Sequence, residues 1–495
     1  MQASSAHFVV YADDSDKDIR RFSEKLERYH AAMAYATGSA AKKAPSPSNR
    51  VTVYVVSSER EVRRLYGEGS KNIGGFYIAR AGGSLAIVPQ LEGSGQGDLD
   101  FSMIVLLHEY AHHFLLSSSA FPMPRWLSEG QAEFFASAKF ETNGDVWVGR
   151  AALHRAGELF YGQDVKAADL LDPAAYEKRR HDSYDAFYGK SWLLYHYLTF
   201  DVARKGQLAK YYKLLITGKS LRDAGIEAFG DPAILERNLD TYLNKGRMLA
   251  LKIAASRLIL DPIDVRQLRV GEAAMIPVII RSRRGVDEKQ AAALLIEART
   301  IAARFPGDPA VLAALAEAEH DAGNDREAIA AADAALAADP KQVNAYVQKG
   351  LSMFRMAADA DDPGAAYTKA RAPFVALNKL ENDHPLPLFY FYQSFVLQGK
   401  TPSALAVQGL EWAVVLAPFD QGQRMTLADQ ELRSGRLAAA RMDLAPIAYS
   451  PHGGSLAKVA QRALARLDSD PKWNGSAGLA VFQESGAELE PEPAK

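Results

Sequence analysis

The stretch LLHEYAHHFLL, residues 106–116, constrains this chain more than any other part of its sequence. It carries His108, Glu109 and His112 in HExxH spacing within an apolar run. On an α-helix, residues four apart lie on one face, so the two histidines can bind one metal ion while Glu109 reaches a water on that ion. One helix would therefore supply two metal ligands and a general base.

A second helix is predicted at PRWLSEGQAEFF, which begins at Pro124 and places Glu129 and Glu133 four apart on one face. Structural zinc usually has four protein ligands, whereas hydrolytic zinc has three and keeps a position for water. Two histidines and one glutamate form a set of the hydrolytic kind. We therefore expect Zn²⁺ bound by His108, His112 and Glu129, with Glu133 as the alternative third ligand.

The HExxH pattern followed by WLSEG, with an acidic residue four positions after the glutamate, resembles the gluzincin, or peptidase MA-like, superfamily. Thermolysin and the aminopeptidase N group belong to it. The resemblance implies an α+β metallopeptidase domain with a thermolysin-like core, in which Glu129 binds zinc and Glu133 orients a ligand histidine. Independently, a zinc-bound imidazole usually donates its other N–H to a carboxylate, carbonyl or water. The metzincin pattern is excluded, because Leu115 and Ser118 stand where it requires glycine and histidine.

Tyr188 is a further catalytic candidate. It lies in FYGKSWLLYHYL, residues 187–198, which is similar to the YxKG segment of aminopeptidase N relatives. That similarity implies that Tyr188 donates a hydrogen bond to the oxyanion formed during attack on a carbonyl, a contact worth about 10² to 10³ in rate. Ser191 replaces the glycine of the family, and several other aromatic residues surround Tyr188, so a packing role stays open.

The residues before the first zinc helix predict an α+β start. AHFVVYADD and RVTVYVVSS have the composition of strands and flank an amphipathic helix over residues 17–35. Residues 74–90 predict a hairpin, and in gluzincins the strand at this place lies beside the substrate cleft, where a peptide can pair with it. The GAMEN motif of aminopeptidases is absent, which leaves exopeptidase and endopeptidase modes open.

We expect the peptidase-like domain to cover residues 1–258. Its strand-rich part would span residues 1–99, the zinc helices would lie within 100–140, and a helical part would follow up to 258. The alternative is that these histidines and glutamates are only polar positions on two amphipathic helices. The whole constellation of spaced residues favours the metal site.

Residues 259–468 are rich in alanine and resemble a tetratricopeptide repeat array. In the clearest unit, residues 309–340, small side chains recur where paired helices must approach closely, and residues 387–418 repeat that arrangement. Weaker copies occupy residues 271–308, 341–384 and 419–452. Such an all-α solenoid presents a concave surface to a protein partner or a peptide. A generic helical bundle is the alternative.

The C-terminal segment, residues 469–495, is acidic and contains prolines without hydrophobic periodicity. This composition predicts a mostly disordered tail, in which Trp473 docks locally.

Composition excludes several classes of partner. With a net charge of −2 and no basic run, the sequence has no positively charged surface of the kind that binds nucleic acid or an anionic membrane. There are no cysteines, so disulfides and thiolate metal sites are ruled out. No apolar run has the length of a membrane helix. The expected partners are therefore a peptide or protein substrate and a protein bound to the repeats.

The N-terminus lacks the basic and apolar regions of a signal peptide. The small, polar MQASSA could nevertheless be a mature terminus left after a signal was removed. Periplasmic or other export is the hypothesis in that case, and a cytoplasmic location otherwise.

Together these patterns predict a zinc-dependent metallopeptidase. Zinc would lower the pKa of its water and polarise the peptide carbonyl, Glu109 would transfer the proton, and Tyr188 would stabilise the oxyanion. The alternative is a catalytically inactive metallopeptidase-like scaffold that acts through its repeats.

Overall fold

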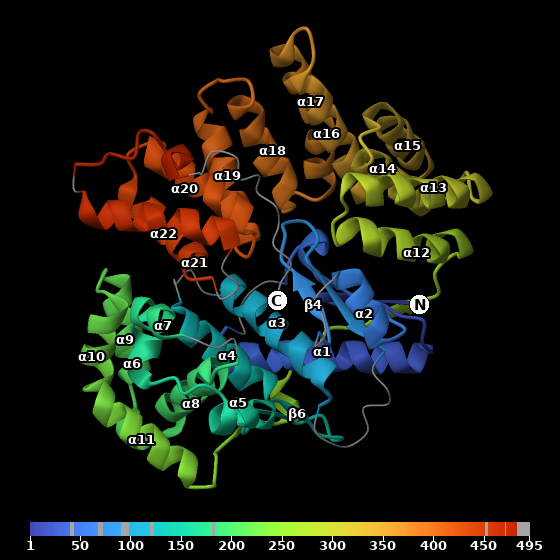
Figure 1. Cartoon of the computed structure of the whole chain (residues 1–495). Coiled ribbons are helices and arrows are strands. Elements are labelled where there is room, and N and C mark those ends of the chain that lie inside the picture. Colours follow the sequence, from blue (N-terminus) through green and yellow to red (C-terminus); the bar gives the residue numbers. More distant parts are fainter. Residues whose placement is uncertain are drawn as a thin grey trace.

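The computed structural model describes residues 1–39, 44–67, 73–90, 99–118, 123–180, 184–450, 454–470 and 472–482. Within them the chain is mostly helical with a small N-terminal sheet (Figure 1). The sheet and the helices around it form the N-terminal part, and an arc of helices from α12 onward, called here the helical array, lies over it. No helix of the described residues is both long enough and apolar enough to cross a membrane.

The N-terminal sheet has six strands in the order β4-β5-β3-β2-β1-β9. Strands β2, β3 and β5 pair in parallel, and the outer pairs are antiparallel. Valine, isoleucine and tyrosine dominate the central strands, as suits a sheet covered on both faces. The strands are β1 (Gln2–Ser4), β2 (Phe8–Tyr11), β3 (Val51–Val56), β4 (Phe76–Ile78), β5 (Leu85–Pro89) and β9 (Asp264–Arg266).

Two capped helices lie within this sheet region. The first, α1 (Asp16–Thr37), begins where the Ser15 hydroxyl accepts a hydrogen bond from the backbone N–H of Asp18, and ends at Gly38 with φ 72°. The N-cap serine and the C-cap glycine provide hydrogen bonds for backbone groups that would otherwise be unpaired at the helix ends. The second, α2 (Glu59–Tyr66), is capped by Ser58 in the same way. The hairpin predicted over residues 74–90 is confirmed as β4 and β5.

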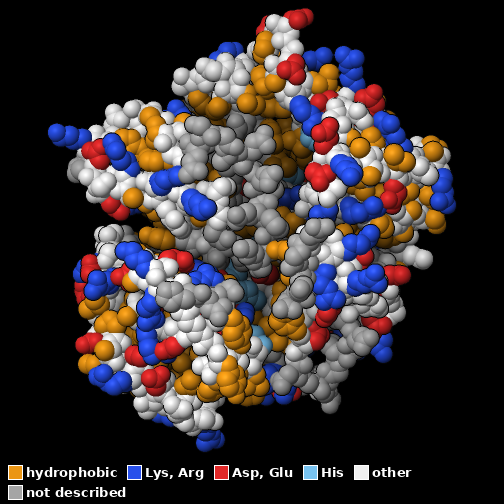
Figure 2. All heavy atoms as spheres, viewed as in Figure 1, with side chains coloured by type: hydrophobic (Ala, Val, Ile, Leu, Met, Phe, Trp, Pro, Cys, Tyr) orange, Lys and Arg blue, Asp and Glu red, His pale blue; other side chains and the backbone are white. Residues whose placement is uncertain are grey.

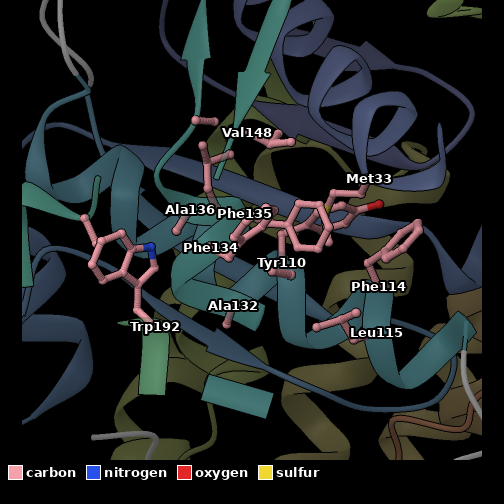
Figure 3. Close-up of a cluster of buried hydrophobic side chains, with 14 of the residues drawn as sticks. Met33, Tyr110, Phe114, Leu115, Ala132, Phe134, Phe135, Ala136, Val148 and Trp192 are labelled. Carbon is pink, nitrogen blue, oxygen red and sulfur yellow. The ribbon is translucent and has the colours of Figure 1, made fainter. Parts of the chain in front are cut away.

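Three largely buried helices form the centre of the N-terminal part: α3 (Phe101–Ser118), α4 (Arg125–Ala136) and α8 (Phe187–Phe200). Helix α4 packs against both others and is buried almost along its whole length. Figure 3 shows side chains from these helices, among them Phe114, Phe134 and Trp192, in one cluster with Met33 of α1. Helices with apolar residues on several faces are stabilised by burial in such a core.

The rest of the N-terminal part consists of a second sheet and several shorter helices. A second sheet has the strand order β6-β7-β8. These elements are β6 (Lys139–Phe140), β7 (Val146–Val148), β8 (Leu251–Ile253), α5 (Ala156–Tyr161), α6 (Ala167–Leu171), α7 (Pro173–Arg179), α9 (Gln207–Ile216), α10 (Leu221–Phe229) and α11 (Pro232–Asn244), with short 3-10 helices η2 (Leu153–Arg155), η3 (Val202–Arg204) and η4 (Ala255–Arg257).

The N-terminal sheet extends past residue 258, where composition placed the end of the first domain. Strand β9 pairs with β1, with Gln2 opposite Arg266 and Ser4 opposite Asp264. A three-residue edge strand buries little and needs no apolar pattern, so composition could not indicate it. The linker between the two parts therefore completes the sheet.

The helical array consists of antiparallel neighbours, each packed on the next. Ala316, Ala328 and Ala335 are fully buried where α14 meets α15, which allows the two helices to approach closely. The helices are α12 (Val270–Arg283), α13 (Glu288–Arg304), α14 (Pro309–Asp321), α15 (Asp325–Ala338), α16 (Val343–Ala358), α17 (Pro363–Leu380), α18 (Pro385–Val396), α19 (Ala404–Leu416), α20 (Gln421–Arg433), α21 (Leu437–Ala448) and α22 (Gly454–Ser469).

The array contacts the N-terminal part near its beginning and again between the end of α17 and α20, where Ser48 donates its backbone N–H (3.0 Å) and its hydroxyl (2.9 Å) to Glu381. Near its beginning, Ile280 of α12 packs in one cluster with Tyr54 and Ile87 of the sheet. Farther along, the backbone N–H of Ala81 donates to Asp420 (2.8 Å). Helices α12 to α20 are arranged as an arc (Figure 1).

Residues that follow the array pack onto it. Trp473, Leu479 and Phe482 join the hydrophobic cluster of α20, α21 and α22, and η5 (Ala480–Phe482) is a short 3-10 helix. The tail predicted to be disordered lies outside the described residues from 483 onward. On the face drawn in Figure 2, Lys and Arg side chains are interspersed with Asp and Glu side chains over both parts.

Candidate metal centre

Helices α3 and α4 bring His108, His112 and Glu129 together. The Nε2 atoms of the two histidines are 3.1 Å apart, and Oε2 of Glu129 lies 3.2 Å from His108 Nε2 and 3.3 Å from His112 Nε2. All three side chains are buried, and they are a group of described residues able to hold a metal ion. The i, i+4 spacing on α3 and the packing of α4 on it produce this convergence.

The three donor atoms fit a tetrahedral zinc ion. Bonds of about 2.0–2.1 Å in a tetrahedron separate neighbouring ligand atoms by roughly 3.3 Å, and the separations here are 3.1–3.3 Å. The other carboxylate oxygen of Glu129, Oε1, is buried without a hydrogen-bond partner among the described residues. Two nitrogens and one carboxylate oxygen are the donors that zinc takes in hydrolytic sites.

The charges at this centre favour an ionised carboxylate. Burial alone would raise the pKa of Glu129, but His112 and His108 hold it below its usual range. Burial opposes protonation of His108, yet the carboxylates of Glu133 and Glu129 raise its pKa to about 10. The surroundings therefore stabilise positive charge at the point where the three side chains meet, and a bound cation would supply it.

Glu133 lies behind His108 rather than beside Glu129. Its Oε1 is 3.0 Å from Nδ1 of His108 and accepts from Arg155 Nε (2.9 Å) and Nη2 (2.6 Å). Its Oε2 is 2.5 Å from Nε2 of His154. Both oxygens are thus engaged away from the Nε2 atoms that meet Glu129, and Glu133 is placed to orient His108.

Three contributors to this arrangement were missed by the sequence analysis. The Oγ atom of Ser128 lies 3.1 Å from Nδ1 of His112, and its position next to Glu129 within WLSEG was the only available signal. His154 and Arg155 come from η2, more than twenty residues after Glu133. No fixed spacing relates such distant residues.

Glu109 is half-buried and more exposed than His108 and His112 beside it. Burial raises the pKa of Tyr66 most, and the negative charge of Glu109 raises it further. The charge of Glu109 also helps to raise the pKa of Tyr77, which burial raises most. Tyr66 ends α2 and Tyr77 lies in β4, so both tyrosines are within reach of the negative charge of Glu109. Strand β4 is at the end of the sheet order, next to α3.

Tyr188 lies beside the centre. Its ring centroid is 6.4 Å from that of His108, and the Arg155 guanidinium lies 4.8 Å over its ring. The charge of Glu129, followed by burial, raises the pKa of Tyr188, while the positive charge of Arg125 opposes this shift. The phenol therefore stays protonated at neutral pH and can donate a hydrogen bond.

Gly130 explains how α4 and α8 can lie so close together. A Cβ atom at this position would be 2.4 Å from the carbonyl oxygen of Ser191. The glycine of WLSEG thus allows the backbone of α8 to approach the helix that carries Glu129. Tyr188 is held near the centre by this packing.

His113 belongs to another face of α3, as the helical period predicts. It is buried, its Nδ1 is 2.6 Å from the Tyr77 hydroxyl, and its ring is 4.4 Å from that of Phe419. It takes no part in the candidate centre.

Comparison with known proteins yields little. No protein-family model matches the chain, and no curated protein matches it significantly. Among solved structures, it is similar to a thermophilic TPR protein of Thermus thermophilus, with 18% sequence identity and a TM-score of 0.35. The match covers 40% of this chain and 100% of that chain. We infer no function from this degree of similarity.

Proposed function

We propose that this protein is a zinc-dependent metallopeptidase with a gluzincin-like centre, joined to a tetratricopeptide-like array that binds a protein partner or the substrate. One observation supports the proposed zinc centre. His108, His112 and Glu129, which come from two helices, meet with separations that suit one tetrahedral ion.

Zinc, when bound by these three residues, supplies a water of lowered pKa and polarises the peptide carbonyl. Glu109 takes the proton of the attacking water and delivers it to the leaving amine, since it follows a ligand directly and is partly accessible. Tyr188 donates a hydrogen bond to the developing oxyanion. Glu133 holds the ring of His108, and Arg155 holds Glu133.

The role proposed for the array rests on its shape. Helix pairs stacked in an arc leave a continuous surface that a single compact helix bundle would bury. Exposed apolar side chains such as Leu405 and Trp412 of α19 lie on this array. A protein or peptide is the partner that such a surface suits.

The decisive experiment combines metal analysis with peptide cleavage. Purified protein should contain about one zinc per chain by mass spectrometry of metals and should hydrolyse members of a mixed peptide library. Glu109→Gln should keep the zinc and lose hydrolysis, while Glu327→Gln, an exposed residue of α15, should behave as the parent. Zinc without cleavage in the parent would favour the inactive scaffold. Absence of zinc binding would refute the centre itself.

A further inference from the structure

A cavity of about 530 Å³ lies within the N-terminal part and is lined by residues from α1, α4, α8 and α9. Helix α4 contributes Gln131, which is about 200° around the helix from Glu129 and so lies on the opposite face. None of the three candidate metal ligands is among the described lining residues. The volume falls within the range of small-molecule sites, which is about 300–1,000 Å³.

The wall of this cavity is uncharged. The described lining residues include no Asp, Glu, Lys, Arg or His. Burial raises the pKa of the Tyr195 and Tyr212 hydroxyls, so both phenols in the lining are neutral at neutral pH. A charged ligand would lose its hydration here without gaining an ion partner, whereas an uncharged apolar ligand would not. The large apolar lining residues are Leu115, Met123, Phe134, Phe135, Phe200, Ile216 and Leu251, of which Leu115, Phe134 and Phe135 are labelled in Figure 3.

One polar side chain of the wall keeps an unpaired acceptor. Gln131 is 7% exposed, and its Nε2 donates to the hydroxyls of Tyr212 (2.9 Å) and Tyr195 (3.4 Å). Its Oε1 is buried and has no hydrogen-bond partner among the described residues. A buried carbonyl oxygen without a partner is unfavourable, and a ligand that donates a hydrogen bond to it would remove that cost.

The cavity has exposed residues at its margin. Ile216, the last residue of α9, is 67% exposed, and Thr199 and Leu251 of the lining are exposed as well. Apolar side chains exposed beside a cavity with a few polar groups are typical of a ligand site. A ligand can therefore enter past Ile216 and cover apolar surface as it does so.

We propose that this cavity binds an uncharged apolar molecule that carries one neutral hydrogen-bond donor, such as an alcohol. The apolar body packs against the aromatic and aliphatic side chains of the wall, and the hydroxyl donates to Oε1 of Gln131. An ion is disfavoured because the described wall offers it no opposite charge. The proposal depends neither on zinc nor on peptidase activity.

The test uses four probes that share one apolar body. Calorimetric titration of the full chain with 4-phenylbutanol should give binding tighter than that of its methyl ether by about threefold or more, because the ether has no donor. The alcohol should also bind tighter than 4-phenylbutylamine and 4-phenylbutanoate, by about tenfold or more, because both are charged at neutral pH. An ether as tight as the alcohol would overturn the hydrogen bond, and an equally tight amine or acid would overturn the preference for an uncharged ligand. Failure of all four at millimolar concentration would overturn the site.

An exposed residue of the lining locates the alcohol. Ile216→Asp adds a carboxylate to the wall and should weaken alcohol binding by about threefold or more, because the ligand would have to desolvate that charge. Ile234→Asp is the matched control, since Ile234 is an exposed residue of α11 outside the described lining. Unchanged binding in Ile216→Asp, or equal weakening in both variants, would place the alcohol elsewhere and refute the proposal.

A second variant tests the acceptor itself. Gln131→Met keeps a side chain of similar length but removes the amide oxygen, so the alcohol and its methyl ether should bind this protein about equally. A preference for the alcohol as large as in the parent would exclude Gln131 as its acceptor. If Gln131→Met does not fold, the probe series and the Ile216 variant still decide the proposal.

Discussion

Nδ1 of His108 lies 3.0 Å from Oε1 of Glu133, and the same carboxylate is held by Arg155 and His154. This contact fixes the ring so that its Nε2 faces His112 and Glu129. The candidate centre therefore has an outer layer of polar contacts as well as three converging donors. Such outer contacts raise the basicity of a ligand and reduce its freedom to rotate.

Loss of the Glu133 carboxylate should weaken zinc binding. We expect Glu133→Gln to lower zinc affinity by about 10- to 100-fold, because the amide holds His108 less firmly and carries no charge. Competition with a coloured chelator measures this affinity. Glu327→Gln serves as the control, and an unchanged affinity in Glu133→Gln would contradict the orienting role.

Removal of the Tyr188 hydroxyl should reduce turnover rather than metal binding. For Tyr188→Phe we expect kcat to fall by about 10²- to 10³-fold, with zinc content unchanged, because the oxyanion loses a hydrogen-bond donor. Steady-state kinetics on a peptide from the library tests this. Tyr195→Phe is the matched control on α8, since the Tyr195 hydroxyl accepts from Gln131 instead. Equal effects of both substitutions would indicate packing alone.

A side chain at Gly130 should destabilise the N-terminal part. In Gly130→Ala the new Cβ would meet the Ser191 carbonyl oxygen, which belongs to backbone and cannot rotate away. Overpacking of this kind costs about 1–3 kcal/mol. Urea denaturation should show the loss, whereas Gly307→Ala, where the added Cβ has no atom within 4 Å, should stay close to the parent. A Gly130→Ala protein of parental stability would disprove the tight contact.

Asp321 should make stability depend on pH. Burial raises its pKa from 3.8 to about 6, although the Ser282 hydroxyl donates to it at 2.5 Å. A carboxyl whose pKa is higher in the folded chain favours folding most below pH 4, and this contribution is lost as pH rises through 6. Asp321→Asn should therefore gain about 1–2 kcal/mol over the parent at pH 8 and little at pH 4.

Urea denaturation of both proteins at the two pH values measures this difference. Asp333→Asn, an exposed position of α15, should show no comparable change with pH. A gain of equal size at pH 4 and pH 8 would mean that titration of Asp321 is not its cause.

Local patterns predicted much of the candidate site. The period of an α-helix places His108 and His112 on one face without reference to the rest of the fold, and the same holds for Glu129 and Glu133. The strands, the hairpin over residues 74–90 and the helices of the array likewise follow from short-range periodicity and capping residues. The activity, the zinc ion and the partners remain predictions that the experiments above test.

By itself, the sequence determined that two helices each present a pair of spaced donors. Only the tertiary structure decided that Glu129 meets the Nε2 atoms while Glu133 meets Nδ1 of His108, because both glutamates share one helix face and the packing of α4 on α3 chooses between them. Tertiary packing also brought Arg155 to Glu133 and β9 to β1. Contacts between distant residues depend on how whole elements pack, and no short-range pattern records them.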